Sequence, residues 1–189
     1  MEKIIWEVRY RSLIGAVRYC KKCSQKKKYV CSGQFRINAQ RKSLDIWLIY
    51  KCSYCDTTWN SEIYSRINPQ SLSLERLEKF HRNDSELVRK YGMDVGFLRR
   101  NGAEVYLPDY EIIGDEICIG AAKELRIVSQ YPCSLKVSTI LREKLSLSRK
   151  EFEKMLICGE IRSHSMDDLT KCKLNQGIIV LIGYGTDSR

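Results

Sequence analysis

The chain has 189 residues and a formal net charge of +10, with 43% hydrophobic and 30% charged residues. No apolar run approaches the ~20 residues that a membrane-spanning helix needs. The first residues include acids and no small-residue cleavage site, so we expect no secretory signal. Nine cysteines in a chain without a signal favour a reducing cytosol over a disulfide framework.

The positive charge is concentrated at the two ends of the chain. Residues 1–59 hold 13 Lys and Arg against 4 Asp and Glu, a net of +9. Residues 60–132 hold 10 against 12, a net of −2, and residues 133–189 hold 10 against 7, a net of +3. Clustered positive charge favours a polyanion such as nucleic acid. On charge alone, a merely solvated surface remains the alternative.

Residues 1–60 are expected to form a small β-rich domain. Short β-branched and aromatic runs predict strands, most clearly over 44–51, and the polar residues 38–43 predict a turn before that strand. About 60 residues bury too little surface to fold firmly without a metal or another staple. We therefore expect this domain to depend on a bound metal ion.

Four cysteines in this segment have the spacing of a closed metal site. They form two pairs, each with two residues between its cysteines, and 28 residues separate the pairs: Cys20 and Cys23, then Cys52 and Cys55. Two such pairs supply the four sulfur ligands of a tetrahedral zinc site with no open position for water. We predict a zinc ribbon with one structural zinc ion.

Other interpretations of the cysteines remain. Thiolate ligands in tetrahedral geometry also bind iron, as in rubredoxin-like sites. A redox Cys-x-x-Cys pair and four unrelated buried thiols are the further alternatives. The remaining cysteines are expected to be small core residues: Cys31, Cys118, Cys133, Cys158 and Cys172.

Residues 61–132 are expected to be a mixed helix and strand region that connects the two ends. Leucine and phenylalanine at helical spacing predict a helix over 72–80. Asp84 is expected to cap a second helix that ends at Gly92, and Asp94 to cap a third. Strand-like runs return over 104–128.

Residues 133–184 are expected to form a third domain of two helices followed by strands. The first helix is predicted over 135–145. Ser148 and Glu151 have the spacing of a capping box for the second helix, and Gly159 is expected to end it. A closing strand is predicted over 178–182.

This last segment resembles the alpha-L RNA-binding motif, the small domain of the ribosomal S-four type, over residues 135–182. The residues that carry the resemblance are Lys136, Ile140-Leu141, Leu145-Ser146-Leu147-Ser148-Arg149, Gly159-Glu160-Ile161 and Leu174-Asn175-Gln176-Gly177. The resemblance implies contacts to RNA phosphates from six residues: Lys136, Ser148, Arg149, Lys150, Lys154 and Arg162. Lys136 stands where the family usually has arginine, and Ser163-His164-Ser165 replace its usual Val-Asn-Gly.

The whole chain also resembles an uncharacterised family of zinc-ribbon proteins from Firmicutes. The resemblance rests on Ile5-Trp6-Glu7-Val8, the first cysteine pair, Leu44 to Cys52, and Thr57-Thr58-Trp59-Asn60. It implies placement in a family without implying an activity.

A second group of basic residues surrounds the first cysteine pair. Its candidate RNA contacts are Lys21, Lys22 and Lys27, with three tyrosines nearby for base stacking: Tyr19, Tyr29 and Tyr54. The alternative is a set of solvated lysines, with the tyrosines packing the ribbon. The three tryptophans are expected in the core.

Together these features predict an α+β protein with an N-terminal β-rich zinc ribbon, a small helical and strand middle region, and a C-terminal alpha-L-like motif. We expect a non-catalytic protein of the cytoplasm that binds structured RNA, ribosomal or transfer RNA, without a membrane or a small-molecule substrate. Neither His81 nor His164 has a catalytic partner at motif spacing, and we see no Gly-rich cofactor loop. The alternative function is an adaptor whose ribbon docks a protein of the transcription or translation machinery.

Overall fold

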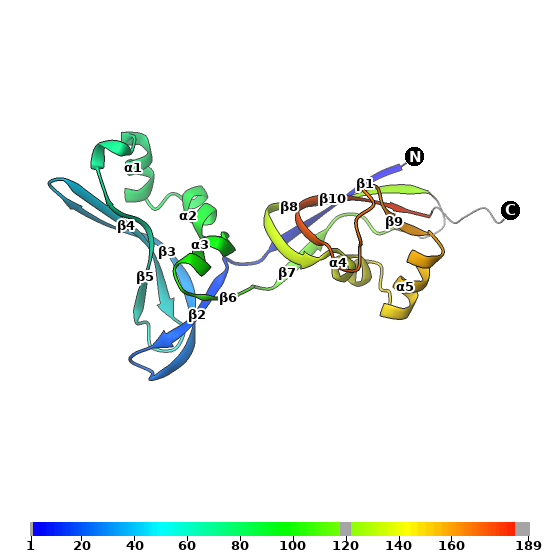
Figure 1. The fold of residues 1–189 in the computed structure, drawn as a ribbon, viewed down its shortest axis with the longest axis horizontal. Helices are drawn as coiled ribbons and strands as arrows, with labels where there is room; N and C mark the ends of the chain where they lie inside the picture. The colour runs from blue at the N-terminus through cyan, green and yellow to red at the C-terminus, as the bar shows by residue number, and fades with distance from the viewer. Residues whose placement is uncertain (1, 118–121, 184–189) are drawn as a thin grey trace. The chain divides into compact units, whose positions relative to one another are not determined.

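The computed structural model describes residues 2–117 and 122–183, so the predicted core residue Cys118 lies outside the described residues. The chain divides into two compact units. Unit 1 comprises residues 1–11 and 110–189, and unit 2 comprises residues 12–109. Each unit is built on a five-stranded sheet (Figure 1).

The predicted α+β class is wrong, because the described chain is 48% strand and 24% helix. The described residues form two five-stranded sheets rather than a ribbon with a small middle region and a C-terminal motif. The first strand does not join the sheet of the cysteine-rich segment but pairs with strands of the C-terminal half. A strand of the expected connecting region pairs with the strand that ends at the first cysteine pair. The elements expected to form three modules therefore form two larger sheets.

The sheet of unit 2 is antiparallel throughout, in the order β5-β4-β3-β2-β6. Its strands are β2 (Gly15–Cys20), β3 (Gln25–Gln40), β4 (Ser43–Cys52), β5 (Thr58–Ile67) and β6 (Glu104–Tyr106). The central strand β4 alternates strictly: Leu44, Ile46, Leu48, Tyr50 and Cys52 are buried. This alternation of period two orients one face of the sheet toward the core.

Short helices cover that face of unit 2. They are the 3-10 helix η1 (Pro69–Ser71), α1 (Leu74–His81), α2 (Ser85–Gly92) and α3 (Val95–Arg100). The predicted caps are confirmed, since the Asp84 and Asp94 carboxylates accept the backbone N–H groups of Leu87 and Phe97, each at 2.9 Å. Phe80 of α1 and Leu87 of α2 pack in one cluster with the buried residues of β4.

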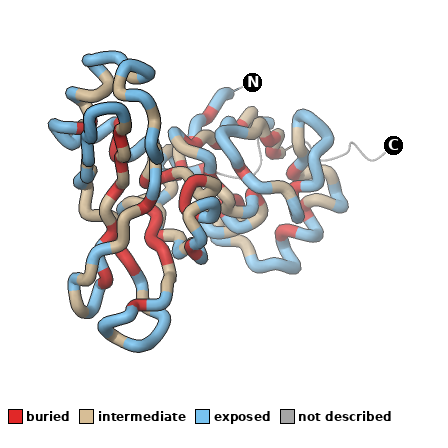
Figure 2. Tube along the Cα trace, turned by 60° about the vertical axis from the view of Figure 1, so that its left-hand side comes forward, coloured by how far each residue is buried: buried red, intermediate tan, exposed pale blue. Residues whose placement is uncertain are grey.

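The sheet of unit 1 has the order β7-β1-β8-β10-β9. Its strands are β1 (Glu2–Tyr10), β7 (Tyr110–Ile113), β8 (Lys123–Lys136), β9 (Ile161–Ser163) and β10 (Lys173–Ile182). β1 runs parallel to β8, and the other pairings are antiparallel. In each unit buried residues occur along the strands and on the helices, and the end of the β3–β4 hairpin is exposed (Figure 2).

Two helices complete unit 1: α4 (Val137–Lys144) and α5 (Arg149–Ile157). The capping box of α5 is confirmed, with Ser148 Oγ accepting from the Glu151 N–H and the Glu151 carboxylate accepting from the Ser148 N–H. Val137, Ile140 and Phe152 are buried in the core of this unit. In the described residues, no helix is long and apolar enough to cross a bilayer.

Candidate metal centre and nucleic-acid interface

The four predicted cysteines converge at one end of the sheet of unit 2. Their Sγ atoms all lie within 4.8 Å of one another. The Sγ atoms of Cys20 and Cys55 are 3.5 Å apart, and those of Cys23 and Cys52 are 4.0 Å apart. A tetrahedral zinc ion with bonds of about 2.3 Å places its sulfur ligands about 3.8 Å apart. The cluster therefore has the dimensions of a four-sulfur metal site.

The two cysteine pairs share one backbone geometry. Each pair begins at the last residue of a strand, β2 or β4, and turns back immediately. The residue after each second cysteine has a positive φ, 52° at Ser24 and 57° at Asp56. In the second pair, the Asp56 N–H donates to the Cys52 carbonyl at 3.0 Å. Matching turns at the ends of β2 and β4, the two strands that flank β3, direct two pairs of thiols at one point.

The surroundings of the sulfurs shift the pKa values of the thiols in both directions. The Tyr29 hydroxyl beside Cys20 lowers the pKa of that thiol to about 6. The Thr57 hydroxyl, 3.1 Å from Cys55 Sγ, lowers the pKa of the Cys55 thiol. Burial, with three sulfurs nearby, raises the pKa of the Cys23 thiol to about 12. Four thiolates this close need a cation to offset their mutual repulsion, and sulfur donors suit zinc or iron.

A closed four-sulfur site leaves no coordination position for water or substrate. A metal held there would join β2 and β4, whose ends carry one cysteine pair each. It would supply cross-linking and no chemistry on a substrate. The other described cysteines lie outside the cluster: Cys133 is buried, Cys31 and Cys172 are partly buried, and Cys158 is exposed. The expectation that Cys158 is a core residue is therefore wrong, because α5 ends just before it at the surface.

The lysines around the first cysteine pair lie on or beside the β2–β3 hairpin. Lys21 and Lys22 are exposed in the turn. Lys27 is partly buried, and its Nζ lies 4.7 Å from the centroid of the Tyr54 ring. Lys28 Nζ lies 3.7 Å from the centroid of the Tyr106 ring. The structure thus places cations directly against aromatic rings, an arrangement worth about 0.5–1 kcal/mol per contact at exposed sites.

The aromatic residues of this region divide into two groups. Tyr19 and Tyr54 are 62% and 78% exposed. Tyr29 is buried against Trp59 and the cysteine cluster, so the expectation that it stacks on bases is wrong. Among the tryptophans, Trp6 is buried in unit 1, whereas Trp47 and Trp59 are only partly buried.

The six C-terminal candidates belong to unit 1, whereas the lysines around the cysteines belong to unit 2. All six are exposed. Local interactions engage Ser148, which caps α5, and Arg149, whose Nε donates to Glu153 Oε1 at 2.8 Å. Lys150 and Lys154 are one helical turn apart on α5.

Unit 1 has 15 Lys and Arg against 13 Asp and Glu, and unit 2 has 18 against 10. The positive charge is therefore concentrated in unit 2, at +8 against +2.

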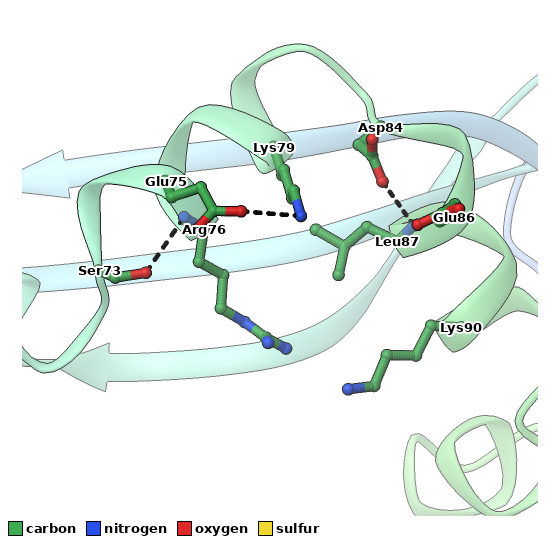
Figure 3. A pocket seen from close by; sticks show the side chains of 8 residues that line it. All are labelled: Ser73, Glu75, Arg76, Lys79, Asp84, Glu86, Leu87 and Lys90. Atoms are coloured by element: carbon green, nitrogen blue, oxygen red, sulfur yellow. Dashed lines mark hydrogen bonds and ion pairs between the residues drawn. The ribbon is translucent and has the colours of Figure 1, made fainter.

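A small hollow of 280 Å³ lies at the start of α1 and α2 (Figure 3). Several of its polar groups are engaged in helix capping or in an ion pair within a helix. Ser73 and Asp84 are the N-caps of the two helices, and Glu75 forms an ion pair with Lys79 at 3.0 Å. Leu87 supplies an apolar side to the hollow. We interpret this hollow as a product of helix capping rather than as a catalytic site.

A larger groove of 890 Å³ follows the β8–β10 pair of unit 1. His164 lines it together with Arg126, Lys171 and Asp167. Register shifts in β10 between Lys173 and Gly177 occur along this groove. His81 lies elsewhere, exposed at the end of α1.

Sequence reasoning missed Glu104 and Tyr106 as neighbours of the lysines. Lys26 forms an ion pair with Glu104, and Tyr106 lies under Lys28. Both contacts arise because β6 pairs with β2, far earlier in the chain. No local spacing in the sequence signals that pairing.

The structure defines the chain as a β-rich protein with a four-cysteine cluster in one of two compact units. The chain belongs to the family described as protein of unknown function (DUF1062), whose model matches residues 37–167. This span includes the second cysteine pair, while the first pair precedes it. Neither the comparison with curated proteins nor that with solved structures found a match.

Proposed function

We propose that this protein is a non-catalytic RNA-binding protein and that its four cysteines hold one structural zinc ion. The observation that carries the proposal is the concentration of lysines, with exposed tyrosines between them, around the cysteine cluster of unit 2. Fixed positive charge with aromatic rings interleaved is typical of surfaces that bind nucleic-acid backbones and bases. The thiolate ligands need a reducing compartment, so the proposal places the protein in the cytoplasm.

Elemental analysis of the protein purified without added metal tests the zinc ion. We expect about one zinc per chain, lost when Cys20 or Cys52 is replaced by serine. Bound iron would give the coloured protein of a rubredoxin-like centre and would overturn the assignment to zinc. Cys158→Ser is the matched control, because Cys158 is exposed and outside the cluster.

Filter binding to transfer RNA or ribosomal RNA fragments over a salt series tests the RNA function. Affinity should fall steeply with salt, because each phosphate neutralised releases counterions. Replacing Lys21 and Lys22 by glutamine should lower both the affinity and the slope of its salt dependence. Arg89→Gln with Lys90→Gln on α2 is the control of equal charge, and we expect it to bind as the parent does. Affinity that does not change with salt would contradict the proposal.

The C-terminal residues are proposed as a second RNA contact, from Lys136, Lys150 and Lys154 chiefly. Lys150→Gln with Lys154→Gln should weaken binding further when combined with the change at Lys21 and Lys22. If the double change on α5 leaves affinity unaltered, α5 has no part in binding. A bound protein partner that survives nuclease treatment would instead favour the adaptor function.

A further inference from the structure

The strand register of unit 2 defines a second face of its sheet, opposite the helices. Directly paired residues of antiparallel strands lie on the same face. The buried residues of β4, such as Leu44 and Ile46, share their face with Phe80 of α1 and Leu87 of α2. Lys51 is on the other face of β4, and it pairs with Val30 of β3. That face can be followed across β2, β3 and β6 by the same rule.

We call this surface the open face. Its members pair in the register as Tyr19 with Lys26, Val17 with Lys28, Val17 with Glu104, Gly15 with Tyr106, and Lys51 with Val30. The side chains of Tyr19, Val30 and Tyr106 are 62%, 53% and 42% exposed. Lys26, Lys28 and Lys51 are exposed as well. Three large apolar or aromatic side chains thus alternate with three lysines on one uncovered sheet surface.

Tyr106 of the open face is positioned by its neighbours on β2 and β3. A Cβ at Gly15 would lie 3.3 Å from Cδ1 of Tyr106, so the absence of a side chain at Gly15 leaves room for the ring. Lys28 Nζ lies over the same ring at 3.7 Å. Glu104 offsets the charge of Lys26 by an ion pair. Lys28 and Lys51 supply positive charge on either side of Val30.

We propose that the open face binds single-stranded RNA, with one base stacked on Tyr19, a second stacked on Tyr106 once Lys28 Nζ moves from that ring to a phosphate, and a further phosphate in contact with Lys51. This inference rests on the proposed RNA function and names its ligand. Exposed aromatic rings need unpaired bases to stack upon, and those of a duplex are covered by their neighbours. Tyr106 of β6 pairs with Gly15, which lies four positions before Tyr19 on β2, so the two tyrosines are offset by about 13 Å along the strand direction. That distance matches roughly four stacked nucleotides at ~3.4 Å each.

The chemistry of the open face favours a nucleic acid over a protein partner. A hydrophobic docking surface for a protein is depleted of lysine at its centre. Here lysines stand between the apolar side chains in the register itself. Stacking on aromatic rings also tolerates any base, so binding should depend little on sequence.

Fluorescence anisotropy with the full-length protein tests the inference. The probes are a labelled single-stranded RNA of about 12 nucleotides, within the usual site size of such surfaces, and the same strand annealed to its complement. Tyr19→Ala and Tyr106→Ala should each weaken single-strand binding by about 5-fold or more, the loss of one base stack. Tyr19→Phe and Tyr106→Phe should retain affinity, because phenylalanine still stacks. Leu74→Ala, an exposed apolar residue on α1, is the control and should have no effect.

The outcomes separate this inference from the proposed function. If the parent protein binds RNA and Lys21→Gln with Lys22→Gln weakens it, but neither tyrosine change does, the open face is not the site and RNA binding by charge stands. If the parent binds no RNA, both proposals fall. A nuclease-resistant protein partner lost in Tyr19→Ala would assign the open face to a protein and overturn the inference. Thermal unfolding of each variant shows whether it is folded. If Tyr106→Ala is not folded, Tyr19→Ala alone tests the inference.

Discussion

At the scale of single residues, Ser24 and Asp56 are in the left-handed backbone region at equivalent positions after the two cysteine pairs. This conformation is unfavourable for residues with a side chain and free for glycine. Ser24→Gly should therefore raise the free energy of unfolding of the metal-loaded protein by about 0.5–1 kcal/mol. Asp56→Gly should gain less, because aspartate tolerates this region better.

Urea denaturation followed by tryptophan fluorescence measures both changes. Ser53→Gly is the control, since Ser53 is in the turn of the second cysteine pair, with Asp56, and does not have a positive φ. There glycine only adds freedom to the unfolded chain, and we expect a loss of stability of about 0.5–1 kcal/mol. A loss at Ser24 as large as that at Ser53 would contradict this account of the turn.

At the scale of elements, the start of α5 should depend on pH through its capping box. The hydrogen bonds between Glu151 and Ser148 lower the pKa of the Glu151 carboxyl below its usual value of 4.5. A carboxyl whose pKa is lower in the folded state stabilises that state above its unfolded pKa. This stabilisation should be present above about pH 4.5 and lost as the pH falls through the lowered pKa.

Thermal unfolding between pH 3 and pH 6 tests this, comparing the parent with Glu151→Gln. Glutamine preserves the capping box without titrating, so the variant should lose the part of the pH dependence due to this residue. Ser148→Ala should lower stability by about 1 kcal/mol at neutral pH through loss of the cap. An unchanged pH profile in Glu151→Gln would show that the cap does not control it.

Elements could be predicted from sequence where their signals are local. The cysteine spacing located the cluster, and Asp84, Asp94 and Ser148 located three helix starts, because a cap acts within one turn. The sheets could not be predicted in this way. Nothing near Glu104 indicates that it pairs with Val17, and nothing near Ile5 indicates a parallel partner at Arg126. Such pairings are decided by the packing of the whole chain.

At the scale of the whole molecule, removal of the metal should destabilise the fold strongly. Structural zinc sites contribute about 10–16 kcal/mol of apparent binding free energy at neutral pH. Chelation, or Cys52→Ser, should therefore lower the midpoint of thermal unfolding markedly and slow refolding. Acidification should act in the same direction, because protons compete with the metal for the thiolates. Calorimetry with and without chelator checks this, and a midpoint that does not move would exclude a structural metal.

The pairing of β1 with β8 has a consequence for the order of events during synthesis. Residues 12–109 form a complete unit that interrupts the other one in the sequence. β1 leaves the ribosome before unit 2 but must wait for Lys123–Val128 before its parallel partner exists. Unit 2 should therefore fold while β1 is still unpaired, since domains fold as units during translation. A fragment of residues 12–109 supplied with zinc should show the circular dichroism of a folded β protein, and an unfolded fragment would reverse the order inferred here. Until β8 has been synthesised, the nascent chain carries an apolar strand, Ile4 to Val8, without its parallel partner. This strand is exposed to aggregation for as long as ribosomes take to synthesise more than a hundred residues.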